Sequence, residues 1–118
     1  MKVSGFSWVG LATDDFRRSL AFFRDVLGLE TWVEGEDQAI LRTSSGQQLE
    51  IFGGDEAEKR LTRTPVIAFE VDDFDAALDE LRRAGIELIG ETGTWNGYSW
   101  QYFRSPDGHP FEIKTSPQ

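Results

Sequence analysis

Residues 9–30, VGLATDDFRRSLAFFRDVLGLE, decide the fold of this chain, because residues 67–88, IAFEVDDFDAALDELRRAGIEL, repeat their pattern 58 positions later. Each stretch begins with an apolar run, continues with Asp-Asp-Phe and an amphipathic helical pattern, and then reaches a glycine. A second motif, Gly-x-x-x-Glu-Ile, starts at Gly46 and again at Gly108, an offset of 62. An offset that grows by only four residues indicates a duplicated unit with one loop insertion.

The first copy predicts a strand, a helix and three further strands. Residues 6–12 form the apolar strand, and Thr13 or Asp14 can cap the helix that follows. Gly28 is expected to end this helix, whose apolar residues fall on one face: Phe16, Leu20, Phe23 and Leu27. The three later strands are expected at residues 30–34, 38–43 and 47–52.

The second copy has the same order. The strand spans residues 66–71, Asp72 is the expected cap, and Gly85 ends the helix. The helix presents one apolar face, formed by Phe74, Leu78 and Leu81, and three strands follow at residues 86–90, 99–104 and 109–114. The chain is therefore predicted to be an α+β protein of two tandem βαβββ modules.

Two polar segments complete the expected organisation. Residues 53–65, GGDEAEKRLTRTP, suit a surface linker rather than a packed element. Residues 90–99, GETGTWNGYS, are expected to form a glycine-rich loop whose Trp95 and Tyr98 could cover a cavity. We expect a single domain over residues 1–118, with module 1 at about 5–53, a linker at 54–65 and module 2 at about 66–115.

Composition excludes several classes of partner. The chain has 118 residues with a formal net charge of −9, which opposes binding to nucleic acid and to anionic lipid surfaces. It has no cysteine, so disulfides and thiolate chemistry are excluded. Neither a signal peptide nor an apolar run long enough to span a membrane is recognisable in the sequence. We expect a cytoplasmic protein without nucleic-acid or membrane partners.

The closing segment SPDGHPFEIK, residues 105–114, together with the duplication, resembles the vicinal oxygen chelate superfamily of glyoxalase I, the bleomycin-resistance proteins and the extradiol dioxygenases. The resemblance covers Phe6 to Lys114 and implies a curved mixed sheet around a cavity. It also implies a homodimer, because the cavity-forming sheets in this family often come from two chains. It does not fix a reaction, since one fold supports many functions.

The resemblance implies four positions at which metal-dependent members of that family hold their metal ion. These fall on Trp8 and Val66 in the first strands of the modules and on Glu50 and Glu112 in their last strands. Tryptophan and valine cannot bind a metal ion. His109, the only histidine, lies three residues before Glu112, so the two side chains point to opposite faces of a strand and His109 is expected on the outer face. We expect no metal cofactor, and a weakly held divalent ion completed by waters is the alternative.

The residues that remain favour ligand binding. On a strand, Glu50 and Glu112 point away from their apolar neighbours, and Trp100 and Tyr102 share a face. The leading hypothesis is a metal-free binder of a small aromatic or cationic ligand, held by Trp8, Glu50, Trp100, Tyr102 and Glu112. Its rival is a lyase, isomerase or dioxygenase that uses a reduced metal site, or Glu50 or Glu112 as a general base. A third reading is a homodimeric module with a vestigial cavity.

Overall fold

The computed structural model describes the backbone of all 118 residues and every side chain except that of Lys59. The chain divides into two compact units. The N-terminal unit spans Trp8–Val66, and the C-terminal unit combines Met1–Ser7 with Ile67–Gln118. In the described part of the chain, no helix is both long enough and apolar enough to cross a membrane.

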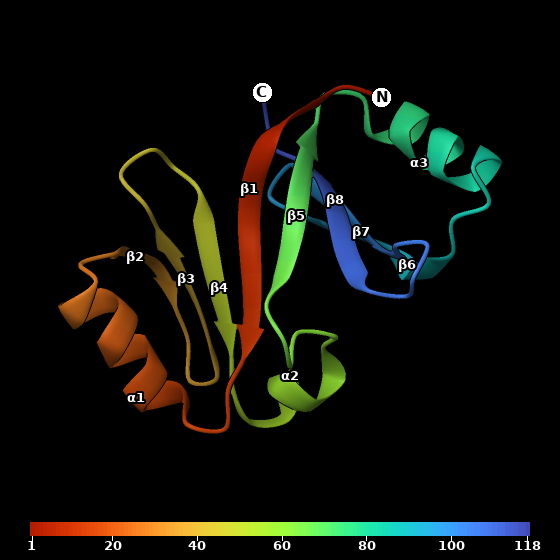
Figure 1. Cartoon of the computed structure of the whole chain (residues 1–118). Helices are drawn as coiled ribbons and strands as arrows, with labels where there is room; N and C mark the ends of the chain where they lie inside the picture. Colours follow the sequence, from red (N-terminus) through yellow and green to blue (C-terminus); the bar gives the residue numbers. More distant parts are fainter. The chain divides into compact units, whose positions relative to one another are not determined.

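The N-terminal unit is a four-stranded mixed sheet with α1 (Phe16–Ala21) on one face (Figure 1). Its strands run in the order β2 (Glu30–Glu34), β3 (Gln38–Arg42), β4 (Gln48–Phe52) and β1 (Val3–Ala12). Only residues 8–12 of β1 belong to this unit. Neighbouring strands are antiparallel except β1 and β4, which are parallel. The core lies between α1 and the sheet and contains Phe16, Leu20, Ala39, Leu41 and Ile51.

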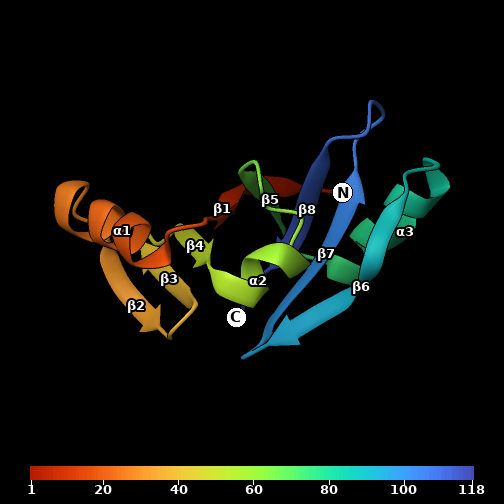
Figure 2. The ribbon, with the colours of Figure 1, turned by 90° about the horizontal axis from the view of Figure 1, so that it is seen from below.

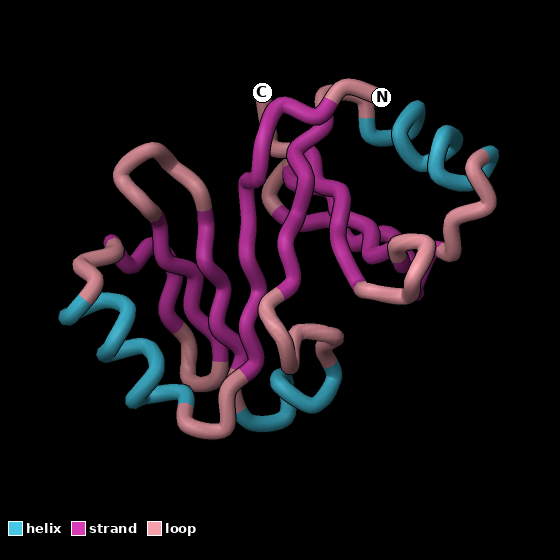
Figure 3. The backbone as a smooth tube through the Cα atoms, viewed as in Figure 1, coloured by secondary structure: helices cyan, strands magenta, loops and turns pink.

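The C-terminal unit repeats this arrangement. Its sheet has the order β6 (Leu88–Trp95), β7 (Tyr98–Arg104), β8 (Pro110–Thr115) and β5 (Val66–Val71), with β5 and β8 parallel and the other pairs antiparallel. The helix α3 (Phe74–Arg83) lies on one side of the sheet (Figure 2) and packs Ala77 and Leu78 against Val71 and Ile113. The predicted α+β fold of two βαβββ modules is confirmed, and the alternation of strands and helices is visible in Figure 3.

The predicted helix caps lie one or two residues too early in the sequence. Asp15, not Thr13 or Asp14, caps α1, with a side-chain oxygen that accepts a hydrogen bond from the Arg18 backbone N–H at 3.2 Å. Asp73, not Asp72, caps α3 through the N–H of Ala76 at 3.1 Å. In both modules the capping carboxylate thus belongs to the aspartate that directly precedes the phenylalanine. Gly28 and Gly85 follow the helices with φ of 74° and 75°, the left-handed conformation that ends a helix.

The first helix also differs from its prediction at its C-terminal end. A π-helical turn, η1 (Phe22–Val26), follows α1, and the Leu27 N–H donates to the Phe22 carbonyl five residues back at 3.2 Å. The wider turn rotates the next residues off the apolar face. Leu27, expected in the core, is 57% exposed as a result.

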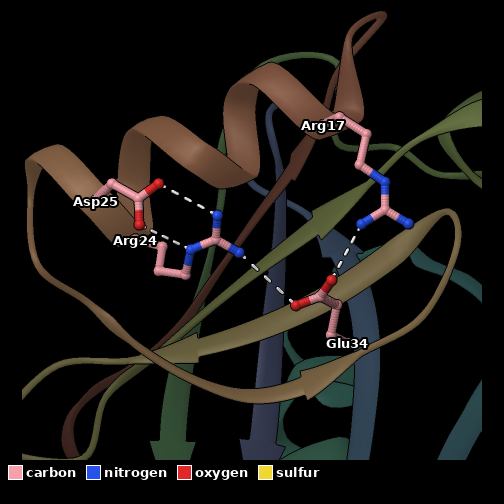
Figure 4. Close-up of polar contacts among 4 residues, drawn as sticks. All are labelled: Arg17, Arg24, Asp25 and Glu34. Carbon is pink, nitrogen blue, oxygen red and sulfur yellow. Dashed lines mark hydrogen bonds and ion pairs between the residues drawn. The ribbon is translucent and has the colours of Figure 1, made fainter.

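An ion-pair network joins this helical segment to β2 (Figure 4). Arg17 and Arg24 approach the Glu34 carboxylate at 3.0 and 3.8 Å, and Arg24 also contacts Asp25 at 2.9 Å. The hydrogen bond from Arg24 lowers the pKa of the Asp25 carboxyl and raises the pKa of the guanidinium. These side chains are exposed to solvent, so the network orients the helix more than it stabilises the fold.

Two further segments correct the sequence analysis. Residues 53–65 are not a plain surface linker, because they contain α2 (Gly54–Lys59), and Ala57 and Thr62 are buried at 2% and 0% exposure. Residues 90–99 are not a loop, since β6 continues to Trp95 and a two-residue turn at 96–97 leads into β7. Both predictions rest on glycine as a break in regular structure, whereas here glycine begins a helix and allows a strand to bulge.

Candidate ligand-binding faces

Glu50 lies on the face of the N-terminal sheet that is opposite to α1. Its neighbours Leu49 and Ile51 pack toward the helix, and side chains alternate along a strand. The register places Gly10 of β1 and Ile40 of β3 beside it. This is the orientation that the strand period predicts. We call the residues around it the first face: Trp8, Gly10, Gln38, Ile40, Gln48 and Glu50.

Both carboxylate oxygens of Glu50 accept hydrogen bonds. The indole N–H of Trp8 donates to Oε1 at 2.9 Å, and the amide of Gln38 donates to Oε2. Trp8 is buried, with 5% of its surface exposed, and Glu50 is half-buried. The two donors fix the direction of the carboxylate, and each oxygen keeps a lone pair for a further partner.

The Trp8 ring occupies the space beside Gly10, two residues further along the same strand. A Cβ atom at position 10 would lie only 2.1 Å from Cη2 of the indole, far inside van der Waals contact. Only glycine therefore lets the ring reach Glu50 in this way. Gly10 is a positioning residue for the first face that the sequence analysis did not identify.

The second face lies in the C-terminal unit, opposite to α3, and consists of Ala68, Trp100, Tyr102, Glu112 and Lys114. Ile113 packs against α3, so Glu112 and Lys114 point to the other side of β8. Glu112 lies between Ala68 and Tyr102 in the register, and it is 3% exposed. Lys114 lies between Glu70 and Trp100 and is 4% exposed. Two charged side chains are thus buried on one face.

Aromatic rings surround these charges. The Trp100 indole lies over Gly93, where a Cβ atom would come within 2.2 Å of the ring, so the second face repeats the tryptophan-on-glycine arrangement of the first. The Lys114 ammonium lies 4.7 Å from the centre of the Tyr98 ring. Tyr98 in turn stacks on Trp95 with ring centres 6.2 Å apart and planes at 18°. A cation, a phenol and a half-exposed indole therefore form a continuous stack.

His109 lies outside both faces. It is in the turn before β8, its side chain is 72% exposed, and its Nε2 is 3.5 Å from Asp107. The Asp107 carboxyl has a lowered pKa, chiefly because it accepts a hydrogen bond from Ser105. His109 thus precedes β8 instead of starting it, and its exposure agrees with the expectation that it does not share a face with the buried Glu112.

The sequence analysis missed three residues that shape the faces, two of them polar and one a glycine. Lys114 is two residues after Glu112, so the strand period alone would have placed it on the same face. Gln38 could not be found in this way, because its contact with Glu50 depends on the register between β3 and β4. Gly10 could not be found either, since nothing in the sequence tells which ring covers a glycine.

The resemblance to the family assigns metal ligands to four positions of this chain, and two of them cannot bind a metal ion. Trp8 and Val66 have no donor atom for a metal, so only the carboxylates of Glu50 and Glu112 remain. Among the described side chains, no three of the His, Asp and Glu type lie close enough together to hold a metal ion. The remaining carboxylates are oxygen ligands, but neither lies in a group of the three or more protein ligands that a catalytic metal site has.

Known proteins share this fold. A methylmalonyl-CoA epimerase from Mycobacterium tuberculosis superimposes with a TM-score of 0.73 at 22% identity, covering 98% of this chain and 89% of the epimerase. A Mn(II)-bound glyoxalase from Novosphingobium aromaticivorans gives a TM-score of 0.75 at 26% identity, covering 97% of this chain and 39% of the glyoxalase. These similarities agree with the duplicated βαβββ architecture.

Comparison of sequences identifies the family. The metallothiol transferase FosB of Lysinibacillus sphaericus is 27% identical over 98% of this chain and 84% of the transferase. The model of one family matches residues 5–113, nearly the whole duplication. The chain belongs to the Glyoxalase/Bleomycin resistance protein/Dioxygenase superfamily.

Proposed function

We propose that this chain binds a small organic ligand, aromatic or cationic, without the help of a metal ion. One observation carries the proposal. At a position where the family resemblance implies a metal ligand, this chain has Trp8, and the indole N–H donates to Glu50 at 2.9 Å. The carboxylate is therefore engaged by side-chain donors, and an aromatic ring occupies the place of a metal ligand.

The two faces have the chemistry that such a ligand needs. Each combines a tryptophan with a glutamate, Trp8 with Glu50 and Trp100 with Glu112. A flat ring can stack on an indole, and a positive charge is attracted both by the ring and by the carboxylate. Polar groups in small number among aromatic side chains are typical of small-molecule sites.

The test is thermal unfolding of chelator-treated protein with two panels of compounds. One panel holds Zn²⁺, Mn²⁺, Fe²⁺, Ni²⁺ and Mg²⁺, and the other holds cationic aromatic compounds, beginning with bleomycin. A ligand at about 100 times its Kd adds about 2.7 kcal/mol to the free energy of unfolding, which raises Tm by several degrees. We expect such a shift in the second panel and none in the first.

Variants show which residues are responsible. Glu50→Gln and Glu112→Gln should each be compared with Glu36→Gln, whose side chain is exposed. We expect the shift produced by a cationic ligand to decrease in at least one of the first two and to stay unchanged in the control, each variant being referred to its own unliganded Tm. A near-stoichiometric metal ion whose stabilisation disappears in Glu50→Gln would contradict the proposal.

An enzyme is the second candidate, favoured by the buried carboxylate of Glu112. In this reading Glu112 or Glu50 acts as a general base on a substrate that carries a carbonyl group, because burial and a neighbouring ring suit a proton-transfer group. The proteins similar to this chain include one named as a metallothiol transferase, FosB, and one named as a Mn(II)-bound glyoxalase. A measurement of product formation distinguishes the binding protein from the enzyme. An enzyme loses product formation in Glu112→Gln or Glu50→Gln while it still binds ligand, whereas a binder forms no product at all.

We also propose that the chain forms a homodimer. Phe6 on β1 is a large apolar side chain that is 63% exposed. Its ring contacts Phe69, with centres 5.5 Å apart, so a partner that covers Phe6 would extend the apolar packing of the C-terminal unit.

A further inference from the structure

We infer that Lys114 is a further ligand-contacting residue of the second face, and that it selects ligands in which a carboxylate is attached to a planar ring. The inference rests on the proposed function, because it specifies the chemistry of the ligand bound there. It adds an anionic group to a ligand that the sequence analysis expected to be aromatic or cationic.

The position of Lys114 is unusual for a lysine. Only 4% of its surface is exposed, in a chain whose net charge is −9 and whose other charged groups are mostly on the surface. Lysine ordinarily keeps its ammonium group in water while its methylene stem packs against apolar surface. Here the strand directs the side chain to the same face as Glu112 and Tyr102. A buried charge outside the helix-packed core is a feature of functional sites rather than of surfaces.

The ring stack fixes the ammonium group. Its nitrogen lies 4.7 Å from the centre of the Tyr98 ring, and Tyr98 is held by Trp95 across the turn at residues 96–97. This cation–π contact orients Lys114. Because an ammonium group has three N–H donors, it can bind an anion in addition to its contacts within the chain. The partly dry surroundings strengthen that attraction compared with water.

The neighbouring groups define the rest of the ligand. Trp100 lies opposite Lys114 in the register of β7 and β8, and its indole covers Gly93, so that the ring offers apolar surface for a planar ligand near Lys114. Glu112, two residues before Lys114, can accept a hydrogen bond from a hydroxyl or amino group of the same ligand. An aromatic acid with a donor on its ring or side chain can contact all three residues at once.

Three compounds with one ring and different charges test the inference. Indole-3-acetate, indole-3-acetamide and tryptamine have side-chain charges of −1, 0 and +1 at neutral pH, and calorimetric titration gives the affinity of each. A charge-assisted hydrogen bond to the ammonium should favour the acetate over the acetamide by roughly tenfold or more. Lys114→Met should abolish this preference, and Lys114→Arg should keep it. Lys2→Met, which removes an exposed lysine, is the matched control.

The ratio of the two affinities separates a ligand contact from a structural ion pair. If Lys114 only pairs with groups of the chain, Lys114→Met lowers Tm but leaves the ratio of acetate to acetamide unchanged, and the inference fails. Tryptamine binding without acetate binding also overturns it, yet leaves the proposed function intact. If none of the three compounds binds at millimolar concentration, the inference fails, and the proposed function is then decided by the cationic panel alone.

Discussion

The pairing of a tryptophan with a glycine is the residue-scale feature common to both modules. Trp8 covers Gly10, and Trp100 covers Gly93. In each case the ring lies on the sheet face that carries a glutamate, and a side chain on the glycine would lift the ring from the sheet. The glycines therefore act through the tryptophans, and their effect on a ligand is indirect.

Gly10→Ala tests this dependence. The new methyl group would overlap the Trp8 ring, and overpacking of this kind costs about 1–3 kcal/mol. We expect Tm to fall by several degrees. Gly35→Ala is the control, because its Cβ would lie at an ordinary 3.5 Å from the Gln38 carbonyl oxygen, its nearest neighbour.

A double-mutant cycle identifies the clash. In a Trp8→Ala background the ring is absent, so Gly10→Ala should cost much less than in the native chain. Equal costs in both backgrounds would show that Gly10 is required by the backbone rather than by the ring.

The orientation of the glutamates is predictable from sequence, and their partners are not. The period of two along β4 and β8 is enough to direct Glu50 and Glu112 away from Leu49, Ile51 and Ile113. The hydrogen bond from Gln38 depends on which residues of two strands lie opposite each other. That register is set by turns and by packing along the whole hairpin, which a local pattern does not contain.

At the scale of elements, helix starts were predicted to within two residues and helix ends only in part. Gly28 and Gly85 were correctly identified as terminators. The π-helical turn before Gly28 was missed, because the spacing of apolar residues was compatible with a regular helix. The helix α2 was missed because charged residues dominate it, although Ala57 is buried. The amino-acid composition of such a short helix reflects its solvent-exposed side, and it does not reveal which residue packs against the rest of the unit.

The strand β6 contains a bulge that one side chain holds. The register to β7 shifts between Ile89 and Gly93, and the amide of Gln101 donates to the carbonyls of Ile89 and Gly90 at 3.0 and 3.2 Å. Its carbonyl oxygen accepts from Thr92 at 2.9 Å, and Gln101 is 3% exposed. The bulge is what brings Gly93 opposite Trp100.

Gln101→Leu should therefore destabilise the β6–β7 hairpin. The substitution removes the partner of the Ile89 and Gly90 carbonyls and of the Thr92 hydroxyl. Because Gly90 and Thr92 are exposed and water can replace part of these bonds, the cost is about 1–2 kcal/mol. We expect Tm to fall by several degrees, together with a change in the near-ultraviolet circular dichroism of Trp100. Gln47→Leu, an exposed position in the turn before β4, should have a small effect. Equal losses in both variants would refute the role assigned to Gln101.

For the whole molecule, the duplication was the most informative property of the sequence. The offsets of 58 and 62 residues predicted two βαβββ modules, and both units have that topology. The repeat did not predict that residues 1–7 would belong to the C-terminal unit while residues 8–12 belong to the N-terminal one. The strand β1 is divided between the two units. A search for repeated segments assigns this strand to the first copy alone.

The shared strand also carries the surface to which we assign the homodimer. In the C-terminal unit, Phe6 begins a row of aromatic rings that continues through Phe69, Phe111 and Phe103, with neighbouring centres 5.5, 5.6 and 6.0 Å apart. Phe6 is the exposed end of this row. A second copy that covers it would bury apolar surface continuous with the aromatic packing of the unit.

Light scattering after size exclusion measures the expected assembly. We expect a mass of about twice 13.4 kDa for the native chain and a shift toward the single-chain mass for Phe6→Ser. Phe22→Ser removes another exposed ring, 47% exposed on the π-helical turn, and should leave the mass unchanged. Because each copy has a net charge of −9, the copies repel each other, and salt screens this repulsion. The dimer should therefore be more populated at physiological than at low ionic strength. A single-chain mass under both conditions, or a dimer lost in Phe22→Ser but kept in Phe6→Ser, would contradict the assignment to Phe6.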